Sequence, residues 1–254
     1  MKRFIFLFIV FIVIMPLIAN NLNTVESPTA GMLSRGEARV HMKIFQENGI
    51  VFGADVGLFD AFQFGLSFGG EEIIGNEKPE LSFEQVAYKV KLRLINEGLT
   101  IPAIAIGVDT QGHGKYYKEE KRYDIKSKGA YVVASKNFNM HGLLGFDLGM
   151  NYTFEWDDDE DKIVDFFAGA YKTIGDNITI FADYSLALND RKRKIEGNDD
   201  ADLWRKSSGY LNTGLQLRLT DQLSLKLLMH DILMNRGDIN NIERSLMIDY
   251  RWFF

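Results

Sequence analysis

The chain has 254 residues, of which 25% are charged and 46% hydrophobic, and its formal net charge is −6. This acidic balance argues against a nucleic-acid partner, because a phosphate backbone attracts an excess of Lys and Arg. The absence of cysteine excludes disulfide frameworks, thiol catalysis, Cys-based metal sites and lipoprotein acylation. Many Phe and Tyr residues with only 4 Pro favour β-structure.

Residues 1–19 have the layout of a secretory signal peptide. Lys2 and Arg3 precede an apolar run, and Ala19 supplies a small residue at the cleavage position. A membrane anchor is the alternative, but the run is shorter than the ~20 residues of a spanning helix and Pro16 interrupts its end. The sequence therefore predicts export with cleavage.

A polar segment with several turn residues follows at residues 20–36. We expect this segment to lie in the periplasm, ahead of the folded domain. The pattern of the sequence changes at Glu37, where the folded domain is predicted to begin.

From Glu37 to Phe254 the sequence consists of segments of about ten residues in which apolar and polar or small residues alternate. In residues 143–155, apolar side chains occupy every second position: Leu144, Phe146, Leu148, Met150, Tyr152 and Phe154. A period of two is the pattern of a β-strand. The sequence predicts about twelve strands and no helix, with the strands at 37–45, 50–58, 62–69, 86–94, 101–109, 130–138, 143–155, 164–172, 177–189, 210–219, 223–231 and 245–254.

The connections between these segments alternate between short and long from the second connection onward. The long connections cover residues 70–81, 112–128, 156–162, 190–208 and 233–241. Outer-membrane barrels show this rhythm because their periplasmic turns are short and their extracellular loops are longer. An even number of strands that starts in the periplasm also returns the C-terminus to the periplasm.

The two faces of the predicted strands differ in the way a barrel in lipid requires. One face is almost purely apolar, and the other is rich in Gly and charged residues, such as Gly53, Asp55 and Lys91. A soluble lipocalin-like barrel is the rival interpretation, but its water-facing side would carry more Lys and Glu and less Gly. We therefore predict an all-β fold, a single closed antiparallel transmembrane β-barrel of about 12 strands at 37–254, in contact with outer-membrane lipid.

The last strand carries a further signal, because its alternate residues form one apolar face that is predicted to touch lipid. These residues are Leu246, Ile248, Tyr250, Trp252 and Phe254. The segment resembles the C-terminal strand that bacterial outer-membrane proteins present to the barrel-assembly machinery. The resemblance implies that this machinery is a partner during biogenesis and that the protein resides in the Gram-negative outer membrane.

Longer stretches resemble the YjbH-type outer-membrane β-barrel proteins, which are associated with exopolysaccharide production. The stretches are PTAGMLSRGEARVHMKIFQENG, GLFDAFQFGLSFGGEEIIG, IPAIAIGVDTQGHGKY, YVVASKNF and ADYSLALND, and the resemblance runs from about Pro28 to Asn189. It implies an outer-membrane barrel linked to surface polysaccharide, with polysaccharide as a partner. These motifs are structural landmarks and imply no catalytic residues.

Charged residues on the inward face form two groups. A basic cluster near the periplasmic mouth is predicted from Arg39, Arg93, Arg218, Lys226 and Arg251, and an acidic wall from Asp109, Asp147, Asp183 and Glu155. Such a separation of charge would impose a field across a pore and bias the binding of anionic groups. The alternative is that the two groups pair across the lumen and fill the barrel, as buried charges normally must.

Enzymatic and metal chemistry have weaker support. His230 and Ser245 are predicted to face the lumen from adjacent strands and are the one pair that a hydrolase interpretation would test. The acidic run at 156–162 offers hard oxygen ligands for Ca²⁺ but lacks the Gly and spaced Glu of a calcium loop, which favours a solvated loop. The segment 111–124, rich in aromatic and basic residues, is either a contact for sugars or lipid phosphates or an ordinary exposed loop.

The sequence as a whole predicts an envelope protein with a structural or transport function, connected to exopolysaccharide production or export. A small porin-like diffusion channel is the first alternative, and an outer-membrane lipid hydrolase is the second. No metal site, cofactor or catalytic residue is predicted.

Overall fold

The computed structural model describes residues 21–75, 79–81, 86–118, 120–155, 162–190, 205–206, 208–236 and 242–254. The predicted signal peptide lies outside these residues, and so does the acidic run except for Lys162. Within the described residues, no helix is long and apolar enough to span a bilayer.

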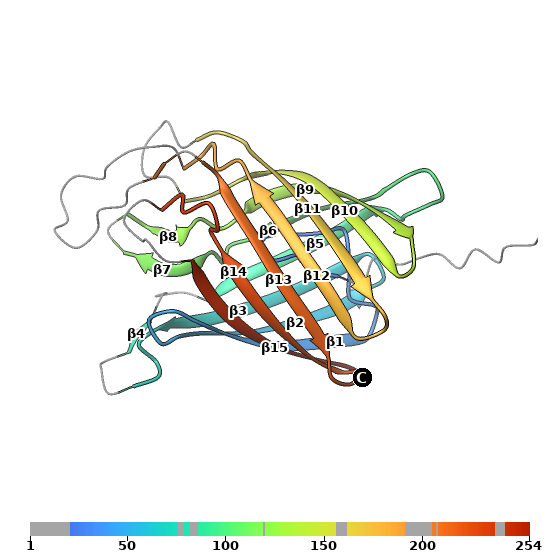
Figure 1. Cartoon of the computed structure of the whole chain (residues 1–254), viewed down its shortest axis with the longest axis horizontal. Coiled ribbons are helices and arrows are strands. Elements are labelled where there is room, and N and C mark those ends of the chain that lie inside the picture. Colours follow the sequence, from blue (N-terminus) through green and yellow to red (C-terminus); the bar gives the residue numbers. More distant parts are fainter. Residues whose placement is uncertain are drawn as a thin grey trace, which may run out of the picture.

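Twelve long strands in the described part of the chain form one closed antiparallel barrel (Figure 1). In chain order they are β1 (Glu37–Phe45), β2 (Gly49–Phe59), β3 (Phe62–Glu71), β5 (Ala87–Ile95), β6 (Ala103–Asp109), β9 (Gly129–Asn139), β10 (Leu143–Tyr152), β11 (Asp165–Ile174), β12 (Ile178–Ser185), β13 (Tyr210–Arg218), β14 (Leu223–His230) and β15 (Glu243–Phe253). The predicted fold class and strand count are confirmed.

Pairing of the first and last strands closes the barrel. In the β1–β15 ladder, Glu37 lies opposite Phe253 and Ile44 lies opposite Leu246. Beyond the ladder, the backbone N–H of Phe254 donates to the carbonyl of Gly36 at 2.9 Å. Gly36 has a φ of +78°, which an L side chain rarely adopts. The C-terminal residue is therefore held by its backbone, while its side chain is free to face outward.

The strand connections divide the barrel into two ends. The end that carries the C-terminus, on the right in Figure 1, has the connections 60–61, 96–102, 140–142, 175–177 and 219–222, and we call it the turn end. The opposite end has one short turn at 46–48 and the long connections 72–86, 110–128, 153–164, 186–209 and 231–242, and we call it the loop end. The long connections contain β4 (Glu80–Leu81) and the two-stranded hairpin of β7 (His113–Tyr117) and β8 (Arg122–Ile125).

Two predicted strands end earlier than their alternation suggests. β10 stops at Tyr152 instead of residue 155, and β12 stops at Ser185 instead of residue 189. Beyond β10, the carboxylate of Glu155 accepts hydrogen bonds from the backbone N–H groups of Tyr123 and Ser127 at 2.8 and 2.9 Å. The chain therefore leaves the barrel wall after β10, where Glu155 binds the loop 110–128 inside the barrel.

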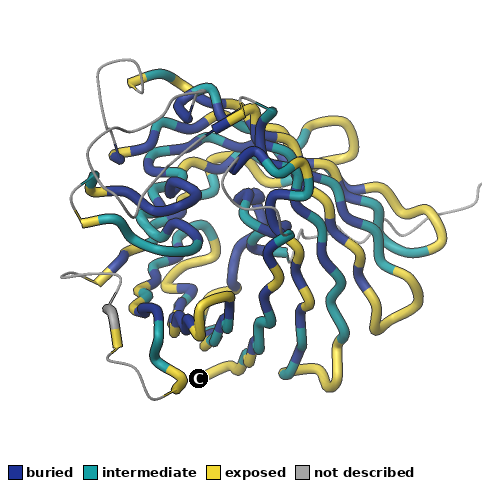
Figure 2. Tube along the Cα trace, turned by 60° about the vertical axis from the view of Figure 1, so that its left-hand side comes forward, coloured by how far each residue is buried: buried dark blue, intermediate teal, exposed yellow. Residues whose placement is uncertain are grey.

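The apolar face of the strands points outward, and the polar face points into the lumen. Buried and exposed residues alternate along the strands in Figure 2. In β10, Leu148 is 66% exposed on the outside, while its neighbour in the sequence, Asp147, is 4% exposed on the inside. The outer surface of the barrel is thus apolar, as in a transmembrane barrel. In a lipocalin the apolar side chains point inward instead.

The C-terminal strand follows the same rule. Tyr250, Trp252 and Phe254 are exposed on the outer surface, and Leu246 and Ile248 are half-buried on the same face. The rings of Tyr250 and Trp252 stack with their centroids 5.9 Å apart. These five residues occupy the outward positions that the alternation predicts for them.

Candidate functional site

The lumen contains the N-terminal segment, which we call the plug and define as residues 21–36. The sequence predicts a periplasmic position for residues 20–36, whereas the plug is folded back inside the barrel. Its tip is a turn in which the backbone N–H of Thr24 donates to the carbonyl of Ser27 at 3.0 Å. Leu22, Ala30 and Leu33 of the plug are each at most 3% exposed. The plug lies inside because the lumen supplies partners for both its polar and its apolar groups.

Asp183 of β12 holds the tip of the plug. One carboxylate oxygen, Oδ2, accepts a hydrogen bond from the Thr24 hydroxyl at 2.8 Å. The same oxygen accepts the backbone N–H groups of Val25, Glu26 and Ser27 at 2.7, 2.9 and 3.2 Å. Consecutive N–H groups that converge on one anion form a nest, which is a strong anion-binding arrangement. Asp183 of the predicted acidic wall therefore binds the chain's own backbone.

Three further strands hold the base of the plug. Lys91 of β5 is fully buried, and its ammonium group donates to the carbonyls of Leu22 and Gly31 at 2.9 and 3.1 Å. The hydroxyl of Ser135 in β9 accepts the N–H of Ala30 at 2.7 Å, and the amide oxygen of Gln63 in β3 accepts the N–H of Leu33 at 3.1 Å. Strands on several sides of the barrel are thus linked through the plug.

Apolar contacts add to these hydrogen bonds. Ala30 belongs to a buried cluster on β6, β9 and β11, and Val25 belongs to a second cluster on β11, β12 and β14. The residues that receive the plug are Ala103, Ala105, Tyr131, Val133 and Phe167 in the first cluster, and Tyr171, Phe181 and Leu228 in the second. Two of the three buried apolar clusters in the described residues are therefore interfaces between the plug and the inner wall.

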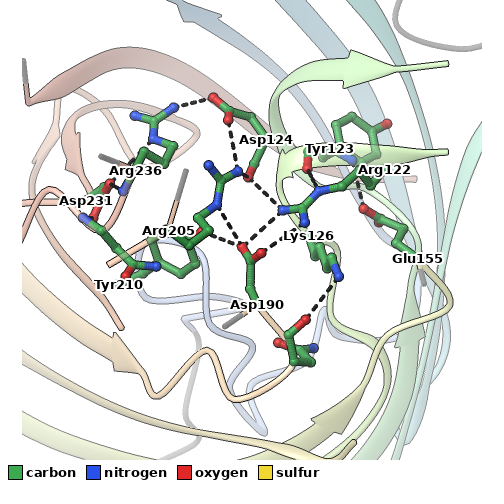
Figure 3. Close-up of polar contacts among 12 residues, drawn as sticks. Arg122, Tyr123, Asp124, Lys126, Glu155, Asp190, Arg205, Tyr210, Asp231 and Arg236 are labelled. Atoms are coloured by element: carbon green, nitrogen blue, oxygen red, sulfur yellow. Dashed lines mark hydrogen bonds and ion pairs between the residues drawn. The ribbon is translucent and has the colours of Figure 1, made fainter. Parts of the chain in front are cut away.

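At the loop end a second element, the β7–β8 hairpin, folds inward. Arg122 of the hairpin forms a two-pronged ion pair with Asp190, at 2.9 and 3.0 Å, and is 1% exposed (Figure 3). Arg205 donates to the same carboxylate at 3.2 Å and to the carbonyl of Asp124 at 2.7 Å. Segment 111–124, expected to be an exposed loop or a surface contact, is instead buried at this point.

The same network continues to the last long connection. Arg236 binds the side chains of Asp124 and Asp231 and forms an ion pair with Glu243 at 2.9 Å. Together with Glu155, which binds the hairpin backbone, the network joins the hairpin to three other long connections (Figure 3). Such a dense set of buried ion pairs fixes one arrangement of the loops rather than leaving them to move independently.

The pKa of Asp190 reflects this environment. Burial alone would raise the pKa of this carboxyl group, but the neighbouring guanidinium groups of Arg122 and Arg205 outweigh burial and hold the pKa well below its usual range. At Glu155, burial is the stronger effect and raises the pKa of the carboxyl group. The hydrogen bonds from the N–H groups of Tyr123 and Ser127 only partly offset it. Asp190 therefore stays charged in the folded protein and holds Arg122 and Arg205 together.

A small polar chamber of about 90 Å³ remains between the plug and the loop end. Its charged lining consists of four carboxylates and four ammonium groups: Glu26, Asp109, Asp165, Asp190, Lys43, Lys89, Lys126 and Lys128. A polar chamber of this size is large enough to hold water. The balance of charge means that the chamber has no marked preference for either sign of ion.

Three members of the predicted basic cluster, Arg39, Lys226 and Arg251, lie around Asp249, and the other two lie apart from them. Arg39 is buried between two carboxylates, at 2.7 Å from Asp249 and 3.1 Å from Asp55. Arg251 lies near the same Asp249 at 3.5 Å, and Lys226 lies inside the barrel with its ammonium group 5.5 Å from the ring of Phe181. The remaining members, Arg93 and Arg218, are at the turn end, where Arg93 donates to the carbonyl of Asp60 at 3.1 Å and Arg218 is exposed.

The predicted acidic wall is likewise divided among separate partners. Asp109 forms an ion pair with Lys89 at 2.7 Å, and Asp147 accepts the hydroxyl of Ser135. Asp183 binds the plug, and Glu155 binds the β7–β8 hairpin. Opposite charges thus pair locally, mostly along neighbouring strands, which matches the filler alternative more closely than a field across an open pore.

A compact polar cluster lies where the plug, the hairpin and the wall meet. The hydroxyl of Ser245 and Nε2 of His230 are 2.7 Å apart, so the one pair singled out for a hydrolase is indeed formed. His113, expected in an outer loop, stacks on His230 with the ring centroids 3.8 Å apart. Glu26 of the plug reaches Nδ1 of His230 at 3.2 Å. His113 and Glu26 could not be assigned to this cluster from the sequence, because their partners lie far away along the chain.

No protein-family model and no curated protein matches this sequence. Solved structures with a similar arrangement of strands include a KdgM porin, at 9% identity and a TM-score of 0.49, covering 86% of this chain and 99% of that one. An outer-membrane channel from Pseudomonas putida F1 aligns at 11% identity and a TM-score of 0.46, covering 87% and 97%. Omp33 of Acinetobacter baumannii aligns at 8% and 0.44, covering 86% and 97%. The likeness is one of general barrel architecture.

Proposed function

We propose that the protein is a channel of the Gram-negative outer membrane that its own N-terminal plug holds closed. The observation that carries this proposal is the grip of Asp183 on the plug tip through four hydrogen bonds from residues 24–27. A barrel with a purely structural role needs only a filled interior, which apolar side chains provide. Hydrogen bonds between the wall and the plug can be replaced by hydrogen bonds to water. The plug can therefore leave the lumen.

The membrane location rests on the outer surface of the barrel. Large apolar side chains are exposed all round it, among them Phe52, Leu148, Phe166 and Leu227. A monomer in water rarely exposes contiguous apolar patches beyond a few hundred Å². The predicted signal peptide and the outward C-terminal residues support export and outer-membrane insertion. Extraction of the protein from envelopes by detergent, but not by urea or carbonate, would support this location.

The solute class follows from the chamber and the pairing of the lumen charges. Because the charged lining is balanced and Arg39 is neutralised by Asp55 and Asp249, we propose passage of neutral, hydroxyl-rich solutes rather than selective passage of anions. A saccharide fits this chemistry.

The YjbH-type resemblance of the sequence adds exopolysaccharide export as the proposed cellular role. Loss of surface polysaccharide in a deletion strain, restored by the intact gene, would support that role.

Single-channel conductance in planar bilayers tests the gating. The intact protein should be mostly closed, whereas Asp183→Asn should show frequent openings and deletion of residues 22–33 a persistently open state. Asp221→Asn, in an exposed turn at the turn end, is the matched control and should behave like the intact protein. A plugless barrel that inserts but does not conduct would refute the channel proposal.

A lipid hydrolase is the second candidate, because Ser245 and His230 are within hydrogen-bond distance. Both residues face the lumen and are at most 6% exposed, so an acyl chain in the bilayer has no path to the hydroxyl. We therefore place passage of solutes ahead of catalysis. Release of fatty acid from outer-membrane lipid by the purified protein, abolished by Ser245→Ala, would reverse this order.

A further inference from the structure

Four aromatic rings on the inner wall lie in the apolar clusters that receive the plug. They belong to Tyr131 of β9, Phe167 and Tyr171 of β11, and Phe181 of β12, and each residue is at most 5% exposed. The plug residue Ala30 shares a cluster with the first two rings, and Val25 shares a cluster with the other two. The plug therefore covers a row of aromatic side chains that runs over neighbouring strands.

The two rings on β11 lie along the wall. The end of the Phe167 ring takes the space that a side chain at Gly149 of β10 would need, and Tyr171 lies over Gly145 of β10 in the same way. The ring on β9 covers a glycine of β6. The ammonium group of Lys128 lies over the Phe167 ring, 5.2 Å from its centroid. A ring in this position turns a face toward the lumen.

Hydrogen-bond acceptors lie on the same inner faces as the rings. Ser135 follows on β9, and Asp183 comes two positions after Phe181 on β12. Ser135 accepts the N–H of Ala30 at 2.7 Å, and Asp183 accepts the N–H of Val25 at 2.7 Å. A sugar ring offers an apolar C–H face to an aromatic ring and hydroxyl donors to acceptors beside it. The wall beneath the plug therefore matches both parts of a sugar.

The plug leaves part of the hydrogen-bonding capacity of this wall unused. Within the described residues, Nε2 of Gln63, the hydroxyl of Tyr131 and Oδ2 of Asp147 are buried and have no hydrogen-bond partner. Gln63 already binds Leu33 of the plug through its amide oxygen, so its amide nitrogen lies next to the plug. Buried polar groups are normally paired. An occupant with more hydroxyl groups than the plug would satisfy them better.

We propose that this part of the wall is a saccharide-binding track, which the plug occupies in place of the saccharide. We define the track by its four rings and two acceptors: Tyr131, Ser135, Phe167, Tyr171, Phe181 and Asp183. The inference rests on the proposed passage of saccharides and names the groups that would bind the solute. A neutral saccharide is favoured, because the carboxylate of Asp183 would repel an anionic one.

The direction of the track sets the size of its ligand. β11 runs from the loop end to the turn end, so its two rings are placed one after the other between the two ends. Phe167 and Tyr171 are four positions apart, which is about 13 Å along the strand. A ligand that covers both rings is therefore an oligosaccharide rather than a single sugar.

Isothermal titration of the detergent-purified full-length mature protein with maltohexaose and cellohexaose tests the track. Ala30→Trp uncovers the track without changing it, because Ala30 is 0% exposed and its position has no room for an indole. Deletion of residues 22–33 uncovers the track by a second route. Both variants should bind saccharide at least about tenfold more tightly than the parent protein, in which few molecules have an empty track. A polyethylene glycol of similar mass should not bind.

An aromatic substitution in the Ala30→Trp background tests the role of the rings. Tyr171→Leu should weaken saccharide binding by about fivefold or more, because it removes a stacking face. Phe146→Leu is the matched control, since Phe146 is 48% exposed on the outer face of β10, and it should leave binding unchanged. Heat modifiability on electrophoresis confirms that each variant is a folded barrel.

Hydrogen exchange in the unmodified protein keeps the inference testable if neither uncovered variant folds. Maltohexaose at its highest soluble concentration should accelerate exchange of the amides of residues 24–27, because it competes with the plug. Unchanged exchange, equally tight binding by parent and variants, binding of polyethylene glycol as tight as that of saccharide, or equal effects of Tyr171→Leu and Phe146→Leu would each overturn the inference.

The titration needs no current through the barrel, so it separates this inference from the channel proposal. A barrel that binds saccharide but does not conduct refutes the channel proposal alone. A barrel that conducts after removal of the plug but binds neither saccharide refutes only the track.

Discussion

The carboxylate of Asp183 and the hydroxyl of Thr24 lie 2.8 Å apart, although 159 positions separate them in the sequence. This contact joins β12 to a segment that precedes β1. The same carboxylate collects three consecutive backbone N–H groups, so one side chain organises the whole tip of the plug.

The first prediction concerns the hydrogen bonds between Asp183 and the tip of the plug. Asp183→Asn keeps the size of the side chain but removes the negative charge, and hydrogen bonds to charged groups contribute about 1.5–3 kcal/mol each. We expect the amides of Val25, Glu26 and Ser27 to exchange with solvent at least about tenfold faster in the variant. Hydrogen exchange followed by mass spectrometry measures this, with Asp221→Asn as the control. Unchanged protection of residues 24–27 would show that the apolar contacts alone hold the plug.

The second prediction concerns the pH dependence of the loop end. The pKa of Asp190 is lower in the folded protein than the value of about 3.9 for a free Asp, so the unfolded form binds protons first as the pH falls. The stabilisation by Asp190 is therefore complete above about pH 4 and is lost progressively at lower pH. Amide exchange of the β7–β8 hairpin, corrected for intrinsic rates, should accelerate below that pH.

Asp190→Asn separates this residue from the other acidic groups. The variant should have a less protected hairpin at neutral pH, because Arg122 and Arg205 lose their shared carboxylate. Its protection should also change less than that of the parent protein as the pH falls. An identical pH profile in both proteins would assign the acid sensitivity to another group.

The third prediction tests which side of the barrel meets lipid. Leu148 lies near the middle of β10 and is 66% exposed, so Leu148→Arg should destabilise the barrel by about 2–4 kcal/mol if it faces the bilayer midplane. Leu99→Arg is the control, because Leu99 is 73% exposed in a turn beyond the strands and should lose about 1 kcal/mol or less. Urea unfolding in lipid vesicles measures both. A harmless Leu148→Arg would mean that this surface faces water.

The fourth prediction separates structural from functional roles among the predicted basic residues. Arg39→Ala removes the guanidinium group that the buried carboxylates of Asp55 and Asp249 share, which should cost about 3–5 kcal/mol. Arg218→Ala, at an exposed strand end, should change stability by about 0.5 kcal/mol or less. The same urea experiment compares the two variants. Equal stabilities would remove Arg39 from the set of structural ion pairs.

Much of the barrel was predictable because its pattern is local. In β10, the alternation of Phe146, Asp147 and Leu148 identifies both the strand and the side of the wall that each residue faces. The same period of two predicts where Ser245 and His230 point. Their contact could be predicted as well, because consecutive antiparallel strands joined by one connection must lie side by side.

The plug was not predictable in the same way. Residues 21–36 carry no period of two, and nothing along the chain marks Asp183, Lys91 or Gln63 as their partners. From the sequence, Lys91 is predicted only to point into the lumen. In the structure its ammonium group binds two backbone carbonyls of the plug. The inward turn of the β7–β8 hairpin was missed for the same reason, since the polar residues of 111–124 also suit an exposed loop.

The strands, their two faces and the alternation of turns and loops follow from the local pattern of residues, because side-chain direction in a strand depends only on the parity of the position. What fills the lumen, and which groups meet there, depends on the folded barrel. Glu26, His113 and His230 come together because a closed barrel brings its wall, its inward loop and its N-terminal segment into one small volume. Contacts across such a volume depend on strand order and register, which no local pattern records.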